Sequence, residues 1–477
     1  MKSNERLASA CYLLGSILNA AIGFFFIPIF MSKLSVSDYG AFSILQLCGT
    51  IFSAVFYFGI TSAFTRSYFD YKAEDEKEKC LSTAFILINV GALIQIILGV
   101  ILSKHLSKLL LGDENYNLLV AASLSSASFV FLNYFFLTYF RLSNKPKVFL
   151  VLSVLSAMLN IALTYISLIY MESGINGIIY SGLISQLVTY IILFRVALSN
   201  INIFSFDSIK AKAMLHYGFQ IVLSSAAGLS IIWSDQFFIN HFLSLDDVGI
   251  YSLSVKLAGI MTFIFVTPFF QVVNPIILDS LQNKNITKLC QNYYDKYLYL
   301  GLICILFTYF VAYLYFLFFR GSEYVDALLY LPWLLLSLFF YGSINILSLG
   351  FSITRNMKPQ SKVYIAVALI NILFNIILIP LFGVNGAVLS TILSYSILSF
   401  LLYKISNSLY KVEYSHFCLI PCATIFFMFL SLVYFVESNF AKIFIVIVII
   451  SIFSLWTIRL RSSQLRGNLE ELEGNIK

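Results

Sequence analysis

Long apolar stretches recur along the chain from one end to the other. A helix that crosses the hydrocarbon core of a membrane needs about 20 mostly apolar residues, and fourteen stretches come close to that length or exceed it. Short polar connections separate most of them, and Gly383 after Pro380 divides a nearly continuous run. The sequence therefore predicts an all-α polytopic membrane protein with about fourteen transmembrane helices, at residues 7–31, 40–64, 81–103, 117–140, 148–171, 175–197, 213–242, 248–275, 297–319, 327–354, 363–382, 384–403, 416–436 and 440–458.

Basic residues alternate between rich and poor connections along this pattern. If the N-terminus is cytoplasmic, the cytoplasmic segments hold 24 Lys and Arg residues and the outer segments hold 5. Cytoplasmic loops of membrane proteins carry such an excess of positive charge. The pattern thus supports the span count and predicts that both termini are cytoplasmic.

A ten-residue phrase occurs twice, as "LSVSDYGAFS" at 34–43 and as "LSLDDVGIYS" at 243–252. The copies are 209 residues apart, and Gly174-Ile-Asn-Gly and Gly383-Val-Asn-Gly repeat at the same offset. Six helices separate the equivalent positions, so both halves enter the membrane in the same direction and form a parallel repeat. We therefore expect two six-helix halves, two extra helices and a cytoplasmic tail, at residues 1–200, 201–410, 411–460 and 461–477.

The local chemistry of the phrase indicates a structural role. Ser35 with Asp38, and Ser244 with Asp247, are suited to cap the start of a helix, because side-chain oxygens accept hydrogen bonds from free backbone N–H groups there. We expect the phrase to begin a helix in each half and to carry no chemistry.

Composition agrees with a protein that is solvated by lipid. Hydrophobic residues make up 60% of the chain and charged residues 11%, whereas soluble domains carry about 25% charge. The chain has no GxxxxGK[ST] phosphate loop, its four His are scattered, and no acidic pair or metal spacing stands out. We therefore expect no enzyme, no cofactor, no metal site and no nucleic-acid partner.

Two ionisable residues lie inside predicted spans, where charge is costly and points to a cavity or a partner. Lys256 and Asp235 lie at similar depths on neighbouring spans, about 12 Å and about 10 Å below the outer ends. They either form a structural ion pair or serve a function. In the second case Lys256 would bind an anionic substrate, and Asp235 would bind a coupling cation or proton.

Other candidates mark the cytoplasmic face and the eighth span. Arg66 and Arg355 end the second and tenth spans, where they either reach lipid headgroups or bind a phosphate-bearing substrate. Pro268 and Pro275 predict a kink in the eighth span, with Gln271, Asn274 and Asp279 beside it as gate or cavity residues. Amides elsewhere, among them Gln95, Asn133, Asn160, Gln186, Asn371 and Asn375, either bind sugar hydroxyls or hold helices together.

The first hairpin resembles a known family. "LSVSDYGAFSILQ" followed by "FGITSAFTRSYFD" at 58–70 is similar to the pattern of bacterial polysaccharide and O-antigen flippases, which belong to the multidrug/oligosaccharidyl-lipid/polysaccharide exporter superfamily. Arg66 matches the arginine of that motif, and the predicted layout of spans fits over nearly the whole chain. The resemblance implies a flippase that moves polyprenyl-pyrophosphate-linked oligosaccharide from the cytoplasmic to the outer leaflet of the bacterial inner membrane by alternating access.

Such a protein would serve O-antigen, lipopolysaccharide or other surface polysaccharide biosynthesis. The expected partners are the lipid-linked substrate, membrane lipids, H⁺ or Na⁺ as coupling ion, and a glycan polymerase with chain-length proteins. Two alternatives remain open. An exporter of small cationic compounds would have an acidic cavity, and a membrane glycan polymerase would carry a large outer loop.

Overall fold

The computed structural model describes residues 15, 26–57, 59–71, 73–198, 201, 205–280, 286–319, 322–354, 357–412, 414 and 419–435. Every regular element within these residues is helical, and ten of the helical segments are long and apolar enough to cross a membrane. The predicted all-helical fold is therefore confirmed. The predicted span at 440–458 and most of the one at 7–31 lie outside the described residues, so the count of fourteen and the placement of the termini stay predictions.

The helices follow the predicted spans closely in the first part of the chain. They are α2 (Val36–Phe56), α3 (Ile60–Asp70), α4 (Glu74–Leu111), the 3₁₀ turn η1 (Glu114–Tyr116), α5 (Asn117–Leu142), α6 (Pro146–Tyr165), the π-helix η2 (Ile166–Tyr170), α7 (Gly174–Ala197) and α8 (Ser208–Phe242).

The second part of the chain is built in the same way. Its elements are α9 (Leu245–Met261), the π-helix η4 (Thr262–Val266), α10 (Thr267–Asp279), α11 (Ile286–Phe319), the 3₁₀ turn η6 (Ser322–Tyr324), α12 (Ala327–Leu347), α13 (Leu349–Thr354), α14 (Lys358–Phe382), α15 (Val384–Leu409) and α16 (Leu419–Phe435).

The chain forms two compact units, which are described separately. The first unit comprises residues 1–252 and 368–387, and the second comprises 253–367 and 388–477. These boundaries fall inside helices α9, α14 and α15. This division does not test the two six-helix halves expected from the repeat, which stay a prediction.

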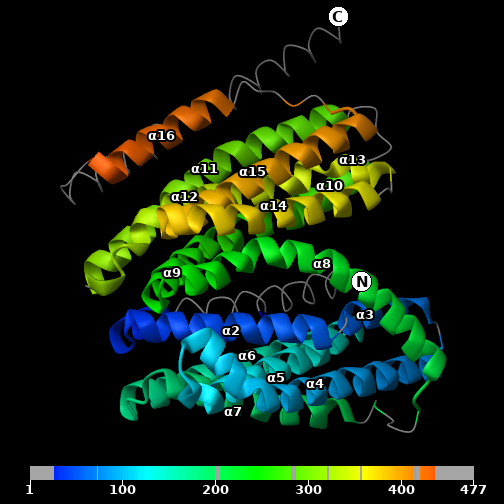
Figure 1. Ribbon diagram of the computed structural model, residues 1–477. Helices are drawn as coiled ribbons and strands as arrows, with labels where there is room; N and C mark the ends of the chain where they lie inside the picture. The colour runs from blue at the N-terminus through cyan, green and yellow to red at the C-terminus, as the bar shows by residue number, and fades with distance from the viewer. Residues whose placement is uncertain are drawn as a thin grey trace, which may run out of the picture. The chain divides into compact units, whose positions relative to one another are not determined.

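Helix α5 lies at the centre of the first unit. It packs against α2, α4, α6 and α7, which run beside it in Figure 1. Aromatic side chains fill the interfaces: Phe64, Phe135 and Phe136 are almost completely buried, and the tilted rings of Phe135 and Phe64 lie 5.2 Å apart between centroids. Such dense packing and the hydrogen bonds between helices hold a membrane bundle together, because lipid supplies no hydrophobic force between helices.

A cluster of charges ties α8 to α4 at the end of the first unit that the sequence predicts to be cytoplasmic. The Lys210 Nζ lies 2.6 Å from Glu76 Oε2 and 3.3 Å from Asp207 Oδ2, and it lies over the ring of Tyr71. Glu76 precedes the predicted span at 81–103, so this cluster lies outside the membrane. The hydrogen bond from Lys210 holds the pKa of Glu76 below its ordinary value.

Tyr297 on α11 organises the second unit. Its ring contacts Phe265, Phe270 and Phe339 at 5.1–5.5 Å between centroids, and its hydroxyl donates to the Phe339 carbonyl. Helix α16 packs on α11, and the hydroxyl of its Tyr434 accepts a hydrogen bond of 2.8 Å from the Trp333 indole N–H. The apolar stretch predicted at 416–436 is therefore a helix that packs on the second unit.

Both helix starts predicted from the repeated phrase are confirmed. Ser35 caps α2 by accepting from the Asp38 N–H at 3.1 Å. At α9 the Asp247 N–H donates to Ser244 Oγ and the Ser244 N–H donates to Asp247 Oδ2, both at 3.2 Å. This reciprocal pair has the geometry of a capping box.

The structure also shows why each copy of the phrase carries a glycine. The two copies lie against each other within the first unit. A Cβ atom at Gly40 would meet the carbonyl oxygen of Leu245, and a Cβ at Gly249 would meet the carbonyl oxygen of Val36. The starts of α2 and α9 therefore approach so closely that only glycine fits at either position.

Two glycines interrupt apolar stretches. Gly383 has φ +62° and separates α14 from α15, which confirms the predicted break. The stretch predicted as a single span over 40–64 is divided between α2 and α3, because Gly59 has φ +61°. A Cβ at Gly59 would meet the carbonyl oxygen of Gly218 at 2.8 Å, so this break is also where α8 makes a close contact.

Candidate functional site

A buried carboxylate lies inside the first unit. Asp235 on α8 is 1% exposed. The Tyr251 hydroxyl donates to its Oδ2 and the Asn375 amide donates to its Oδ1, each at 2.6 Å. These short hydrogen bonds are of the kind that an ionised acceptor makes. Asp235 is therefore held in a fixed position by a residue of α9 and a residue of α14.

Two asparagines one turn apart on α14 complete the surroundings of this carboxylate. Asn371 and Asn375 are both fully buried. Ser234 on α8 donates to Asn371 Oδ1 at 2.7 Å and accepts from Asn375 Nδ2 at 3.1 Å. Carboxylate, amide and hydroxyl oxygens thus gather in a polar pocket within apolar helices, and we call Ser234, Asp235, Tyr251, Asn371 and Asn375 the Asp235 cluster.

One oxygen of the Asp235 cluster has no hydrogen-bond donor within the described residues. Asn375 Oδ1 is buried and unpartnered there, although buried polar atoms are nearly always hydrogen-bonded. A second acceptor beside a carboxylate is suited to a hard cation, which prefers oxygen ligands. Clusters of three or more His, Cys, Asp and Glu are not found in the described part of the chain, so the cluster is unlike a transition-metal site.

Arg66, the arginine of the motif in the first hairpin, is exposed on α3. Its guanidinium lies 4.6 Å above the ring of Tyr217 on α8, which is a cation–π contact. Tyr217 and Asp235 are 18 residues apart on one helix, or about 27 Å. Arg66 and the Asp235 cluster therefore occupy separate parts of the first unit.

The remaining predicted site residues belong to other parts of the chain. Lys256 is half-buried on α9 in the second unit, so its pairing with Asp235 stays a prediction. Gln271 is exposed and Asn274 half-buried on α10, which ends at Asp279. The side chain of Asp279 and the whole of Arg355 lie outside what the structure describes.

The irregularity predicted in the eighth span has a definite form. Helix α9 passes into five residues of π-helix, η4, before α10 begins at Thr267. Pro268 lacks the N–H that would bond to the carbonyl four residues earlier, and a π-turn at this place accommodates the loss. Pro275 lies inside α10. Short π-helical turns of this kind are frequently found at functional sites.

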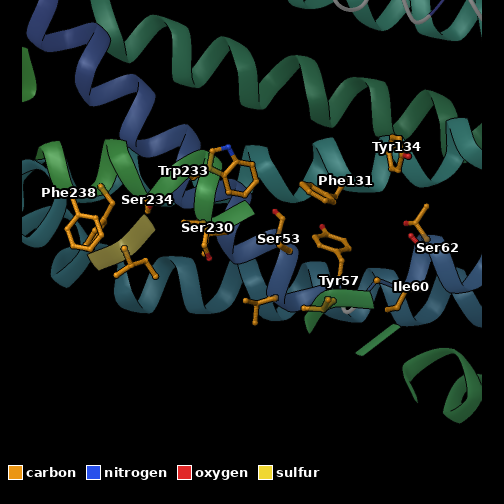
Figure 2. Close-up of a pocket in the computed structure, with 18 residues that line it drawn as sticks. Ser53, Tyr57, Ile60, Ser62, Phe131, Tyr134, Ser230, Trp233, Ser234 and Phe238 are labelled. Atoms are coloured by element: carbon orange, nitrogen blue, oxygen red, sulfur yellow. The ribbon is translucent and has the colours of Figure 1, made fainter. Parts of the chain in front are cut away.

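A groove runs along the first unit beside the Asp235 cluster. It has a volume of about 440 Å³ and is lined by α2, α3, α5, α8 and α14. Figure 2 shows Trp233, Ser230, Ser234 and Phe238 on one side and Ser53, Tyr57, Phe131 and Tyr134 around the rest. Ser234 belongs to both the groove and the Asp235 cluster, because it lines the first and hydrogen-bonds within the second.

Most of the amides noted in the sequence join helices. Asn133 donates to Gln186 Oε1 at 2.8 Å, Asn160 to Ser185 Oγ at 2.9 Å and Gln95 to Ser53 Oγ at 3.0 Å. Gln95 and Asn133 are buried. The interpretation of these amides as contacts between helices is confirmed for these members.

Sequence reasoning missed the asparagines as partners of Asp235. Asn371 and Asn375 are four residues apart and so share a helix face, which was a visible signal. Nothing in the sequence placed that face beside α8, about 140 residues earlier. The groove was missed entirely, because its wall is made of residues that each look like ordinary bundle packing.

Solved structures with a similar arrangement of helices are transport proteins. Lipid II flippase MurJ in an inward closed conformation matches with a TM-score of 0.72 and 19% identity, over 95% of this chain and 99% of that one. A multidrug resistance MATE family transporter of the MOP superfamily in its inward-facing conformation matches with a TM-score of 0.58 and 16% identity, over 87% and 96%. The protein is a multi-pass membrane protein with the fold of this superfamily.

The family follows from the sequence. A model of the family described as polysaccharide biosynthesis protein matches residues 8–281. The chain belongs to this family, which confirms the resemblance seen in the first hairpin. Comparison with curated protein sequences gives no match.

Proposed function

We propose that the protein is a flippase for polyprenyl-pyrophosphate-linked oligosaccharide, and that it moves repeat units from the cytoplasmic to the outer leaflet by alternating access. The product would feed the assembly of O-antigen or another surface polysaccharide in the inner membrane of a bacterium. Membership of the polysaccharide biosynthesis family carries this proposal. The likeness to a lipid II flippase fold adds support, and we expect no enzymatic activity.

The Asp235 cluster is the proposed coupling site for H⁺ or Na⁺. An ionisable group within the membrane is expensive and points to an ion or proton pathway. Protonation would neutralise the charge of the Asp235 carboxylate directly. A sodium ion would be met by Asp235 and by Asn375 Oδ1, which has no partner in the described part of the chain.

The remaining site residues have proposed roles on the substrate side. Arg66, Lys256 and Arg355 would attract the pyrophosphate and acidic sugars. Gln271, Asn274 and Asp279 would line the moving segment around η4 and α10. A glycan polymerase and chain-length proteins are the expected partners after translocation.

Deletion of the gene in the source bacterium tests the function. We expect surface polymer to be lost and lipid-linked repeat units to accumulate on the cytoplasmic face of the inner membrane. Units that reach the outer face without being polymerised would instead indicate a polymerase. Unchanged glycan would overturn the flippase proposal.

Complementation of that deletion tests the named residues. Asp235→Asn keeps the shape of the side chain and removes its charge, so export should fall at normal protein level. Asp246→Asn, an exposed residue at the start of α9, is the matched control. Lys256→Ala should likewise lose export, with exposed Lys404→Ala as its control, and normal export by either test variant would remove that residue from the site.

A second candidate is an exporter of small cationic compounds. The fold likeness to a MATE transporter and the buried carboxylate favour it. It predicts that deletion sensitises cells to lipophilic cations and leaves the glycan intact. The described groove residues include no acidic side chain, which argues for the lipid-linked substrate.

A further inference from the structure

The groove of the first unit is elongated. Its lining residues extend from Val222 to Phe238 on α8, which is about 24 Å at 1.5 Å per residue. On the opposite side they extend from Ile51 on α2 to Ser62 on α3. This shape suits a chain better than a compact ring system.

The surface of the groove is mainly apolar, and three polar groups of its wall are engaged by partners within the protein. Ser53 Oγ accepts from Gln95, the Tyr57 hydroxyl donates to the Ser128 carbonyl at 2.7 Å, and Ser234 donates to Asn371. The described lining residues carry no charge. A glycan would find few hydrogen-bonding partners on such a wall, and a small cation would find no acid. The wall is therefore suited to an apolar ligand, as most small-molecule pockets are.

A positive charge lies beyond one end of the groove. Ser62 lines the groove, and Arg66 follows it on the same face of α3 at i, i+4. The guanidinium is exposed over Tyr217, and the neighbouring Gly218 contacts Gly59. An apolar groove with Arg at its mouth fits an amphiphile with an anionic head, because the planar guanidinium matches phosphate oxygens.

The direction of the groove fits a lipid of the cytoplasmic leaflet. Arg66 lies on the cytoplasmic side according to the distribution of basic residues. From there α3 and α2 lead back toward the middle of the membrane, and α8 leads outward from its cytoplasmic start at Ser208. A lipid carrier in this leaflet has its pyrophosphate at the surface and its chain toward the membrane centre, which is the same direction.

We propose that this groove binds the isoprenoid segment next to the pyrophosphate of the lipid carrier, with Arg66 on the pyrophosphate itself. The inference deepens the proposed function and rests on it for the identity of the substrate. It assigns the first unit a lipid-binding role, and it implies that the protein recognises the carrier whatever sugars the carrier bears. Substrates with different glycans would then share one docking step.

Trp233 provides a direct readout, since it is one of three Trp in the chain and lines the groove. The full-length protein with Trp333→Phe and Trp456→Phe, purified in detergent, would be titrated with geranylgeranyl diphosphate. We expect a saturable change in Trp233 emission. Geranylgeraniol and inorganic pyrophosphate should each bind at least about ten times more weakly, which is about 1.4 kcal/mol. The first lacks the diphosphate and the second lacks the prenyl chain.

Two variants separate the groove from the mouth. Ala54→Phe places a ring inside the groove and should weaken binding of geranylgeranyl diphosphate about tenfold or more. Ala213→Phe, at an exposed position on α8 outside the groove, makes the same change of residue type as the control and should bind normally. Arg66→Gln should weaken binding of geranylgeranyl diphosphate and leave the affinity for geranylgeraniol unchanged.

Defined results would overturn the inference. Unchanged affinity in a folded Ala54→Phe protein would exclude the groove, and pyrophosphate binding as tightly as the prenyl compound would show that only the head is recognised. The proposed function fails separately. If deletion leaves the surface glycan intact while Trp233 still reports binding of prenyl diphosphate, the groove proposal stands and the flippase proposal is wrong. If export needs the protein and the Ala54→Phe variant binds prenyl diphosphate normally, the flippase proposal stands and the groove proposal is wrong.

Discussion

The contact between the two copies of the repeated phrase makes a quantitative prediction at Gly249. Replacing glycine by alanine inside a helix ordinarily stabilises it by about 0.5–1 kcal/mol. At Gly249 the new methyl group would meet the backbone carbonyl of Val36 and lie 2.9 Å from its Cγ1 atom. A backbone cannot move aside as a flexible side chain does, and overpacking of this kind costs about 1–3 kcal/mol. We therefore expect Gly249→Ala to be destabilising by about 1–2 kcal/mol.

A second glycine of the same helix supplies the matched control. Nothing lies within 4 Å of a Cβ built at Gly259, so Gly259→Ala should keep the full gain in helix stability. The two variants change the same residue type in α9 and differ in what the methyl group meets. Thermal unfolding of each purified protein in the same detergent should rank Gly259→Ala above wild type and Gly249→Ala below it.

The result that refutes this reasoning is specific. If Gly249→Ala melts at or above the wild-type temperature, the starts of α2 and α9 do not approach as closely as the structure has them. A companion test is Gly40→Ala, whose methyl group would meet the Leu245 carbonyl on the other side of the same contact. The two single variants should be similarly destabilising, because they disturb one interface.

Three further predictions concern local structure. Lys210→Met should destabilise the protein at neutral pH, and the difference from wild type should disappear as the pH falls. The lowered pKa of Glu76 stabilises the fold above the ordinary glutamate pKa of about 4.3, and this contribution is lost once the carboxyl is protonated. Melting curves over that pH range check it. Gly383→Ala should cost about 1–2 kcal/mol, because its φ of +62° is strained for any residue with a Cβ, whereas Gly383→Asn should cost less in the same assay. Ser244→Ala should lower stability by about 0.5–2 kcal/mol by removing the cap of α9, which hydrogen exchange at the first turn would detect.

The helical fold was predictable because its signals are local. Apolar length, turn residues and basic connections act within about 20 residues, and they locate α4 to α7 and the break at Gly383. The break at Gly59 was not predicted. The left-handed backbone of Gly59 divides the two helices, and α8 lies against it at Gly218. This contact joins distant parts of the chain, so its only trace in the sequence is a glycine in an apolar run.

The candidate site was predictable only in part. Charge inside a predicted span singled out Asp235, because an isolated carboxylate is costly in lipid wherever it occurs. Tyr251 and Asn375, which donate to it, carry a hydroxyl and an amide, and both groups are common in membrane helices for packing alone. Their role depends on which helix faces which, and a single sequence contains no direct record of those pairings.

The rotation of an α-helix explains how α8 serves two sites with consecutive residues. Each residue is turned by about 100° from the one before it, so Trp233, Ser234 and Asp235 face three directions. Trp233 lines the groove and Asp235 is buried against Asn375, while Ser234 lies between them and belongs to both. The Asn375 amide donates both to Asp235 Oδ1 and to Ser234 Oγ, so a change in the position of this amide would also disturb a residue of the groove wall. If the cation proposed for the Asp235 cluster favours one arrangement of Ser234, a groove ligand that favours the same arrangement must raise the affinity for that cation, and the cation must raise the affinity for the groove ligand by the same factor.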